Sequence, residues 1–196
     1  MTGFWDAQAD TLENAKRAAY SEDDYEEATE AHVRLICDLL GDVKGGPLLD
    51  FGCGVGRLMV PMSRATGVEI IGYDTSPEML RHAREQRGTP GLQNTIWFWE
   101  GDLKGVGFFF GAYSMLVFQH LDPTQLADAI SDISHVLFPG APFVFQYVEG
   151  DYHVDFDHRY SEYEIHCLLS GSGLRIVETF PDPQRPEWRW VKAIQE

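Results

Sequence analysis

The chain has 196 residues, 44% of them hydrophobic and 23% charged, and this length and composition suit one globular domain. Lys and Arg number 15 against 31 Asp and Glu, so the formal net charge of −16 disfavours nucleic acid as a substrate, because phosphate backbones are repelled. No apolar run reaches the ~18 residues of a membrane span, the acidic start does not fit a signal peptide, and three scattered cysteines indicate reduced thiols. We therefore expect a cytoplasmic monomer or homodimer without a membrane or nucleic-acid partner.

The N-terminal stretch, residues 1–21, mixes aromatic, small and charged side chains in a weak helical pattern. Whether it is a folded arm or a partly ordered tail stays open. From Ser21 the sequence Ser-Glu-Asp-Asp predicts a helix start, and the helix should run to Gly41. Its expected apolar face consists of Ala28, Ala31, Val33, Leu35, Ile36, Leu39 and Leu40.

The next stretch has the pattern of a cofactor-binding turn. An apolar strand, Leu48–Phe51, leads into glycines at positions 52, 54 and 56, which let the backbone turn tightly and approach a ligand closely. A helix from Val55 to about Ala65 is expected to direct its free N–H groups at that ligand. Dinucleotide folds use G-x-G-x-x-G, but Arg57 occupies the place of that third glycine, which disfavours a nicotinamide cofactor.

A second strand, residues 68–74, ends in a carboxylate. Asp74 follows Gly54 by 20 residues, the separation at which an acid meets a ribose diol in nucleotide-binding α/β folds. A carboxylate can accept hydrogen bonds from both hydroxyls. Thr75-Ser76-Pro77-Glu78 then predicts a capped helix to about Arg87, with Met79 on a face that could touch a purine.

The second half of the chain continues to alternate strands and helices. A Gly-Pro break at 88–91 precedes a buried strand, Asn94–Glu100, and the segment 109–121 allows two registers, of which we prefer the one whose strand ends near Ser114. The further expected elements are a capped helix from Asp122-Pro123, a strand at 142–148, a loop at 149–160, a helix at 161–170 and strands at 174–180 and 188–194. The last two strands are so close in sequence that they should pair antiparallel.

Four segments resemble conserved segments of the class I S-adenosylmethionine-dependent methyltransferases. LLDFGCGVGR at 48–57 resembles motif I, GYDTSPEML at 72–80 the second segment, 109–121 the F-D-L-V-x-S-x-x-V-L-Q-H-L pattern, and 136–140 the V-L-x-P-G segment. The resemblance implies an α/β fold: a single-domain, Rossmann-like, doubly wound seven-stranded sheet, mostly parallel, with an antiparallel C-terminal hairpin. Residues 1–21 would be an N-terminal arm or lid and residues 22–196 the core.

The same resemblance implies the cofactor, the activity and the binding residues. The cofactor would be S-adenosylmethionine, with S-adenosylhomocysteine as product, and the acceptor a small molecule methylated on oxygen or nitrogen. Cys53 would contribute its backbone, Asp102 would lie over the adenine, and Phe110 replaces an acid that is usual in the family. The implied cofactor-binding residues are Asp50, Gly52, Cys53, Gly54, Gly56, Asp74, Thr75, Met79, Gly101, Asp102, Leu103, Ser114 and Met115.

His120 is the candidate general base for an oxygen acceptor, because it follows the fourth strand, at the edge of the sheet where α/β folds bind ligands. The alternative is that this histidine only caps or packs. The loop 149–160 holds several carboxylates and two histidines, but no fixed spacing of metal ligands, so we predict no metal. We favour instead a lid lined by Tyr147, Tyr152 and His153.

Three functions stay open from the sequence. A small-molecule methyltransferase is favoured. A protein of methyltransferase fold that binds the cofactor without turnover, as a partner subunit, comes second. A nicotinamide-dependent oxidoreductase comes third, because of Arg57 and the C-terminal hairpin.

Overall fold

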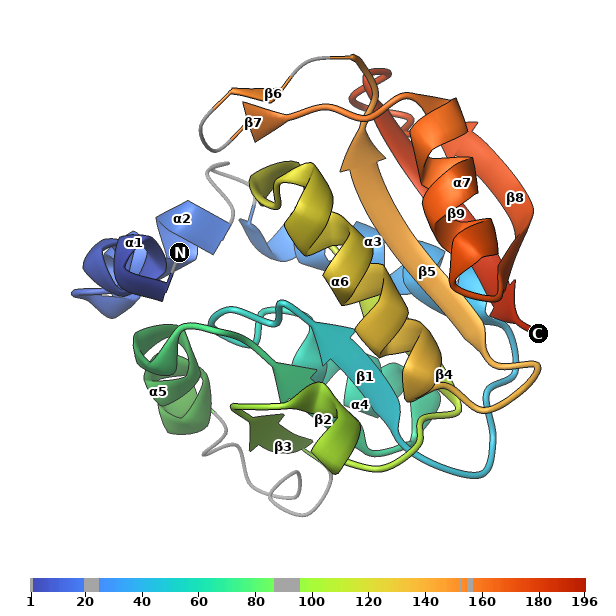
Figure 1. The fold of residues 1–196 in the computed structure, drawn as a ribbon. Helices are drawn as coiled ribbons and strands as arrows, with labels where there is room; N and C mark the ends of the chain where they lie inside the picture. The colour runs from blue at the N-terminus through green and yellow to red at the C-terminus, as the bar shows by residue number, and fades with distance from the viewer. Residues whose placement is uncertain (1, 20–24, 87–95, 152, 155–156) are drawn as a thin grey trace. The chain divides into compact units, whose positions relative to one another are not determined.

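The computed structural model of the chain describes residues 2–19, 25–86, 96–151, 153–154 and 157–196 (Figure 1). The chain forms two compact units, Met1–Asp102 and Leu103–Glu196. Each unit has its own strands and its own covering helices, and each carries part of the predicted site. No helix within the described ranges is both long enough and apolar enough to cross a membrane.

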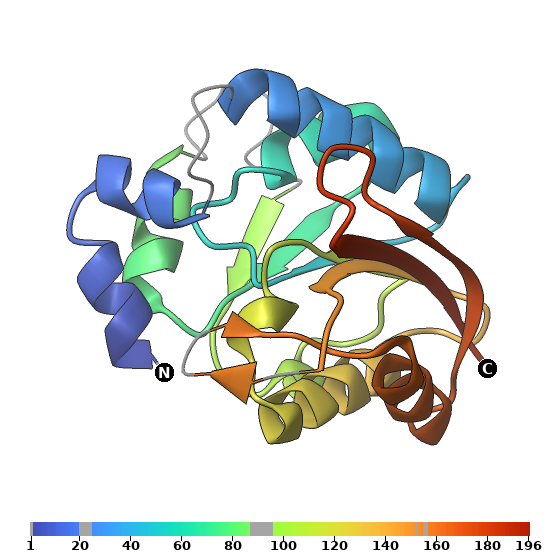
Figure 2. The same ribbon diagram turned by 90° about the horizontal axis from the view of Figure 1, so that it is seen from above.

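The first unit alternates helices with three parallel strands in the order β3-β2-β1. Leu48 pairs with Ile70, and Ile70 with Ile96, so the carboxyl ends of the three strands lie at one edge. Helices α3 and α4 lie side by side, and α1 and α2 lie beside α5 in both views (Figures 1 and 2). The elements are α1 Thr2–Gln8, α2 Leu12–Ala19, α3 Tyr25–Leu40, β1 Leu48–Phe51, α4 Met59–Thr66, β2 Ile70–Tyr73, α5 Pro77–Gln86 and β3 Ile96–Trp99.

The second unit has four principal strands in the order β4-β5-β9-β8, of which β4 and β5 are parallel and the rest antiparallel. Helices α6 and α7 cover the same face of these strands (Figures 1 and 2). The elements are η1 Leu103–Gly105, β4 Gly111–Ser114, η2 Phe118–His120, α6 Pro123–His135, β5 Pro142–Val148, β6 His153–Val154, β7 Asp157–His158, α7 Glu162–Gly171, β8 Leu174–Pro181 and β9 Trp188–Gln195.

Local sequence explains the best-defined helix starts of the second unit. Asp122 caps α6 by accepting from the N–H groups of Thr124 and Gln125, and the Gln125 side chain returns a bond to the Asp122 N–H. Ser161 and Glu164 form the same reciprocal box at the start of α7. These caps fix the two helices that cover β5, every residue of which is buried.

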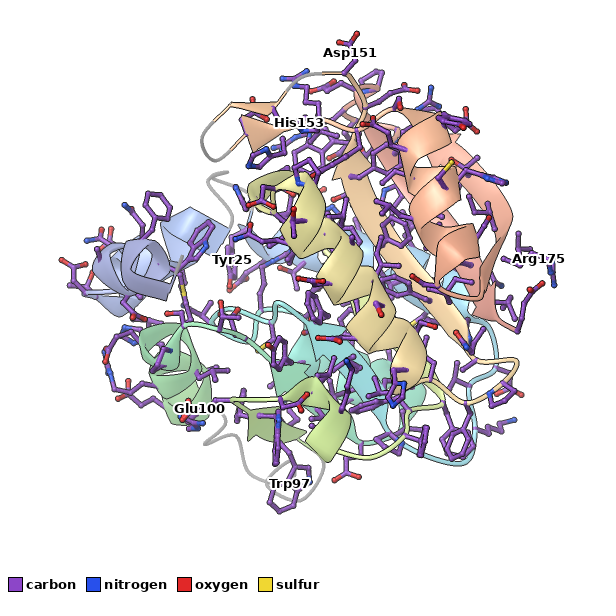
Figure 3. All side chains as sticks on the ribbon, in the orientation of Figure 1. Tyr25, Trp97, Glu100, Asp151, His153 and Arg175 are labelled. Atoms are coloured by element: carbon purple, nitrogen blue, oxygen red, sulfur yellow. The ribbon has the colours of Figure 1, made fainter. Side chains whose placement is uncertain are left out.

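The predicted fold class is confirmed: an α/β, Rossmann-like fold with seven principal strands, mostly parallel, and an antiparallel pair at the C-terminus. The preferred register of the fourth strand is also confirmed, because β4 ends at Ser114. Two predictions need correction. The segment 94–100 is not fully buried, since the Trp97 side chain is 46% exposed on the edge strand β3 (Figure 3), and the loop 149–160 contains a short antiparallel hairpin, β6–β7.

Some predicted boundaries lie outside the described residues. These are the helix start at Ser21, the break at 88–91 and the beginning of the third strand at Asn94. The first described residue of α3 is Tyr25, and its buried face consists of Ala28, Thr29, Val33, Ile36, Leu39 and Leu40.

Candidate functional site

The glycine turn after β1 is built by three glycines in the left-handed region. Gly52, Gly54 and Gly56 have φ of 75°, 53° and 78°, conformations that cost a side-chain-bearing residue about 1–2 kcal/mol. The N–H groups of Gly52 and Cys53 both donate to the Tyr73 carbonyl, at 2.7 and 3.0 Å. These bonds tie the turn to the end of β2, so the residues that follow β1 and β2 are held together.

The helix after this turn starts later than predicted. Helix α4 begins at Met59, and not at Val55, because positive φ at Gly54 and Gly56 keeps the chain out of the right-handed helical region. The side chain of its N-cap residue, Leu58, makes no capping hydrogen bond. A ligand at this turn would therefore meet the backbone of residues 52–58, and not the N-terminus of a helix that starts inside the glycine motif.

Asp74 lies immediately after β2 and is bonded to the glycine turn. Its Oδ2 accepts from the Gly54 N–H at 2.8 Å, and its Oδ1 accepts from the Ser76 N–H at 2.9 Å. Burial raises the pKa of the Asp74 carboxyl above its usual 3.8, neighbouring backbone N–H groups oppose this, and Asp6 adds to the rise. A carboxylate has about four acceptor positions, so capacity beyond the bonds from the Gly54, Ser76 and Thr75 N–H groups remains for a ligand hydroxyl.

Cys53 and Gly72 pack together behind the turn. A Cβ on Gly72 would lie 2.6 Å from Met59 Sδ and 2.8 Å from Cys53 Sγ, so these side chains would have to move to accommodate any larger residue at this point of β2. Burial raises the pKa of the Cys53 thiol well above its usual value, and the Asp50 and Asp74 carboxylates raise it further. Cys53 is therefore a packed thiol and lacks the low pKa that a nucleophilic cysteine needs.

The other predicted residues of the first unit differ in exposure. Asp50 is buried within β1, and Thr75 is exposed. Met79 is 3% exposed in a cluster with residues of α1 and α2. Gly101 has φ of 113°, and the exposed Asp102 accepts from Trp99 Nε1 through its carbonyl at 3.0 Å.

In the second unit the predicted residues lie in η1 and at the end of β4. Leu103 is buried in η1, and Ser114 and Met115 are 2% and 8% exposed. Leu116 follows with φ of 60°, a strained conformation for a leucine, of the kind that costs about 1–3 kcal/mol and often marks a functional site. The sequence did not predict this strain.

His120 ends the short helix η2 and has a polar neighbour. Nε2 of Gln119 lies 3.1 Å from Nε2 of His120, so the amide N–H can donate to the ring nitrogen. Gln119 is buried. The next residue, Leu121, has a carbonyl that accepts from the Tyr160 hydroxyl, which fixes the end of η2 against the segment after β7.

The hairpin β6–β7 carries imidazole groups. The His153 ring lies 5.6 Å from the ring of His158 and 5.0 Å from that of Tyr160, and His153 Nε2 lies 3.9 Å from Glu164 Oε1 (Figure 3). His158 is buried, and among the residues that the structure describes its Nδ1 has no hydrogen-bond partner. Within the described parts of the chain, no group of three or more His, Cys, Asp or Glu is arranged to hold a metal ion.

The remaining predicted lid residues have separate environments. Tyr147 is buried in β5. Burial raises the pKa of its hydroxyl to about 12, and the negative charges of Glu149 and Glu162 contribute to this rise. Glu149 forms an ion pair with Arg189 at 2.7 Å, and Asp151 is exposed at the outer end of the loop (Figure 3). Tyr152 and Asp155 lie outside the described residues.

Sequence reasoning missed the polar environment of Arg57. Its guanidinium donates to Thr29 Oγ1 at 3.0 Å and lies 5.9 Å from the centre of the Tyr25 ring, to which Lys16 also lies close, at 5.8 Å. Arg57 thereby ties the end of the glycine turn to α3. No local signal predicts this contact, because Thr29 precedes Arg57 by 28 residues.

The comparisons with known proteins all point to methyltransferases. Residues 48–140 match the methyltransferase domain family. Methyltransferase phqN of Penicillium fellutanum is 30% identical over 153 residues, 76% of this chain and 46% of that protein. O-methyltransferase rstn1 of Aspergillus nomiae is 32% identical over 124 residues, 61% of this chain and 54% of that protein. The chain spans about half the length of these curated relatives.

A solved structure resembles the whole chain. The magnesium protoporphyrin IX methyltransferase (ChlM) from Synechocystis PCC 6803, crystallised with bound S-adenosylmethionine, superposes with a TM-score of 0.76 at 20% identity. The superposition covers 100% of this chain and 96% of that one. At this identity the likeness establishes the fold alone.

Proposed function

The chain carries, over residues 48–140, a methyltransferase domain of the class I S-adenosylmethionine-dependent family, and on this premise we propose that it methylates a small-molecule acceptor. The observation that carries the proposal is the bond from the Gly54 N–H to Asp74 Oδ2, at 2.8 Å. It joins the glycine turn to the acid that follows β2, and a nucleoside cofactor needs these two features side by side.

The described residues of the first unit fit such a cofactor. The left-handed glycines keep Cβ atoms away from the turn, so a ligand can approach its backbone N–H groups. Asp74 keeps acceptor capacity for the ribose hydroxyls after its bonds to Gly54 and Ser76. From the resemblance to the family we further propose that cofactor binding involves Asp50, Gly52, Cys53, Gly56, Thr75, Met79, Gly101, Asp102, Leu103, Ser114 and Met115.

S-adenosylmethionine supplies a methyl group already attached to a good leaving group, so the protein mainly has to hold the acceptor in line with it. We infer that the chain at the end of β4, from the buried Ser114 to the strained Leu116, helps to hold this geometry. The position matters because a near-attack geometry is lost with small displacements.

For an oxygen acceptor we propose His120 as the general base. Nε2 of His120, which lies 3.1 Å from the Gln119 amide nitrogen, would accept the proton of an acceptor hydroxyl that displaces this amide. His153, with Glu164 at 3.9 Å, is the next residue that could accept a proton.

A small-molecule acceptor agrees with the names of two similar proteins, the O-methyltransferase rstn1 and the magnesium protoporphyrin IX methyltransferase. The net charge of −16 agrees with this, because it disfavours nucleic acid. The choice between oxygen and nitrogen, the cytoplasmic location and the monomeric or homodimeric state stay predictions.

The first test is thermal unfolding with S-adenosylhomocysteine or NAD. A ligand at 100 times its dissociation constant adds about 2.7 kcal/mol to the free energy of unfolding, so S-adenosylhomocysteine should raise the melting temperature. A shift with NAD and none with S-adenosylhomocysteine would favour the oxidoreductase. A screen of hydroxyl- and amine-bearing small molecules with methyl-labelled cofactor then separates an active enzyme from a cofactor-binding partner protein, because only the enzyme transfers label.

A further inference from the structure

The N-terminal arm, defined as residues 2–19 of α1 and α2, packs on the glycine turn and on α5. Ala9 and Ala15 of the arm are fully buried against Val55 and Met79, with Trp5 and Leu12 packed around them. Val55 lies between two glycines of the turn, and Met79 lies on α5. Figures 1 and 2 both show α1 and α2 beside α5. The arm therefore contacts both segments that surround Asp74.

One carboxylate of the arm reaches the start of α5. Ser76 Oγ donates to Asp6 Oδ1 at 2.6 Å, and the Glu78 N–H points to the same oxygen at 3.4 Å. Ser76 is fully buried, and its Oγ also accepts from the Met79 N–H at 3.2 Å. The hydroxyl proton of Ser76 is thereby directed at Asp6 and its lone pair at the helix, which leaves the side chain one orientation.

Ser76 joins Asp6 to Asp74. While its hydroxyl donates to Asp6, its backbone N–H donates to Asp74 Oδ1 at 2.9 Å, and the other oxygen of Asp74 accepts from Gly54. A chain of hydrogen bonds thus runs from the arm to the glycine turn. Bonds to ionised carboxylates are the stronger kind, and such chains hold their members in one geometry.

We propose that Asp6 is a positioning residue of the cofactor site, which through Ser76 holds the Asp74 carboxylate in the orientation that the cofactor ribose requires. This inference rests on the ribose-binding role proposed for Asp74. It makes the N-terminal arm a part of the site through a specific polar contact, in addition to the apolar cover that Trp5 and Leu12 provide.

Asp6 variants test the polar contact by calorimetric titration with S-adenosylhomocysteine. Asp6→Ala should weaken binding about 10-fold, the size expected for the loss of one hydrogen bond to a charged group. Asp6→Asn should stay within about threefold of the original affinity, since an amide oxygen can still accept from Ser76. Asp10→Ala is the matched control, because Asp10 belongs to the same arm, is exposed and accepts from Asn14 Nδ2. Circular dichroism establishes that each variant is folded.

A double-mutant cycle separates positioning from simple covering. If Asp6 acts through Asp74, then Asp6→Ala in an Asp74→Ala background should change the affinity by less than about twofold. Equal losses in both backgrounds, or no loss from Asp6→Ala alone, would overturn the inference and leave Asp74 in its proposed role. An unchanged affinity in Asp74→Ala alone would overturn the role of Asp74 and the inference together.

Discussion

Replacing Asp74 by alanine removes an acceptor that two parts of the site share. The N–H groups of Gly54 and Ser76 lose their bonds of 2.8 and 2.9 Å, while the cost of burying the carboxylate, seen in its raised pKa, is relieved. We expect these opposed effects to leave a net loss of about 1–2 kcal/mol of unfolding free energy, with the fold intact. The ribose hydroxyls lose a charged acceptor worth about 1.5–3 kcal/mol, so S-adenosylhomocysteine should bind about 10- to 150-fold more weakly.

Isothermal titration calorimetry measures this loss, and urea unfolding measures the accompanying change in stability. Asp42→Ala is a suitable control, since Asp42 is an exposed acid that pairs with Lys44 on the loop before β1. Asp74→Asn should also bind weakly, because one of the two accepting oxygens becomes an NH2 group, which cannot accept from the N–H of Gly54 or of Ser76 that faces it. An unchanged affinity of folded Asp74→Ala would refute the reasoning, and Asp74 would then serve only to hold the turn.

Three more changes have definite expected results. Gly72→Ala should lower the free energy of unfolding by about 1–3 kcal/mol, as measured in urea, because its Cβ would overlap Met59 and Cys53. Gly3→Ala, whose Cβ would meet nothing within 4 Å, should not destabilise the protein, and equal stabilities of the two variants would contradict the packing. Burial raises the pKa of Tyr147 from 10.0 to about 12 in the folded state, so the free energy of unfolding should fall as the pH rises from 10 to 12. The fall should be less steep in Tyr147→Phe, and identical pH profiles of the two proteins would contradict this. His120→Ala should lower turnover of an oxygen acceptor about 10²–10⁴-fold with cofactor affinity within a few-fold, and unchanged turnover would leave His120 structural.

The elements predicted most accurately are those that depend on interactions between residues close together in the sequence. The cap at Asp122 and the strand Pro142–Val148 agree with prediction, because a capping box and a continuous apolar run act over a few residues. The start of α4 was misplaced by four residues, because the helical pattern of side chains does not reveal that glycines 54 and 56 take positive φ. The strand around Trp97 was expected to be buried, but the Trp97 side chain on the edge strand β3 is 46% exposed.

The candidate site was predicted as a set of positions, and the bonds between them were not. The spacing of Gly54 and Asp74 indicated a shared ligand, but it could not show that the two residues bond to each other. The contact of Asp6 with Ser76 spans 70 residues, and that of Arg57 with Thr29 spans 28. Such contacts depend on how helices pack, and the periodicity of one segment carries no information about them.

The most direct test of the cofactor site is a ¹⁵N-edited NMR titration with S-adenosylhomocysteine, with the amide signals of the glycine turn assigned. We predict that the largest shifts fall on Gly52, Gly54 and Gly56 and on Asp74, and that NAD at the same concentration leaves these signals unchanged. Binding of S-adenosylhomocysteine that leaves the glycine amides unmoved, or shifts of those amides with NAD alone, would contradict the account.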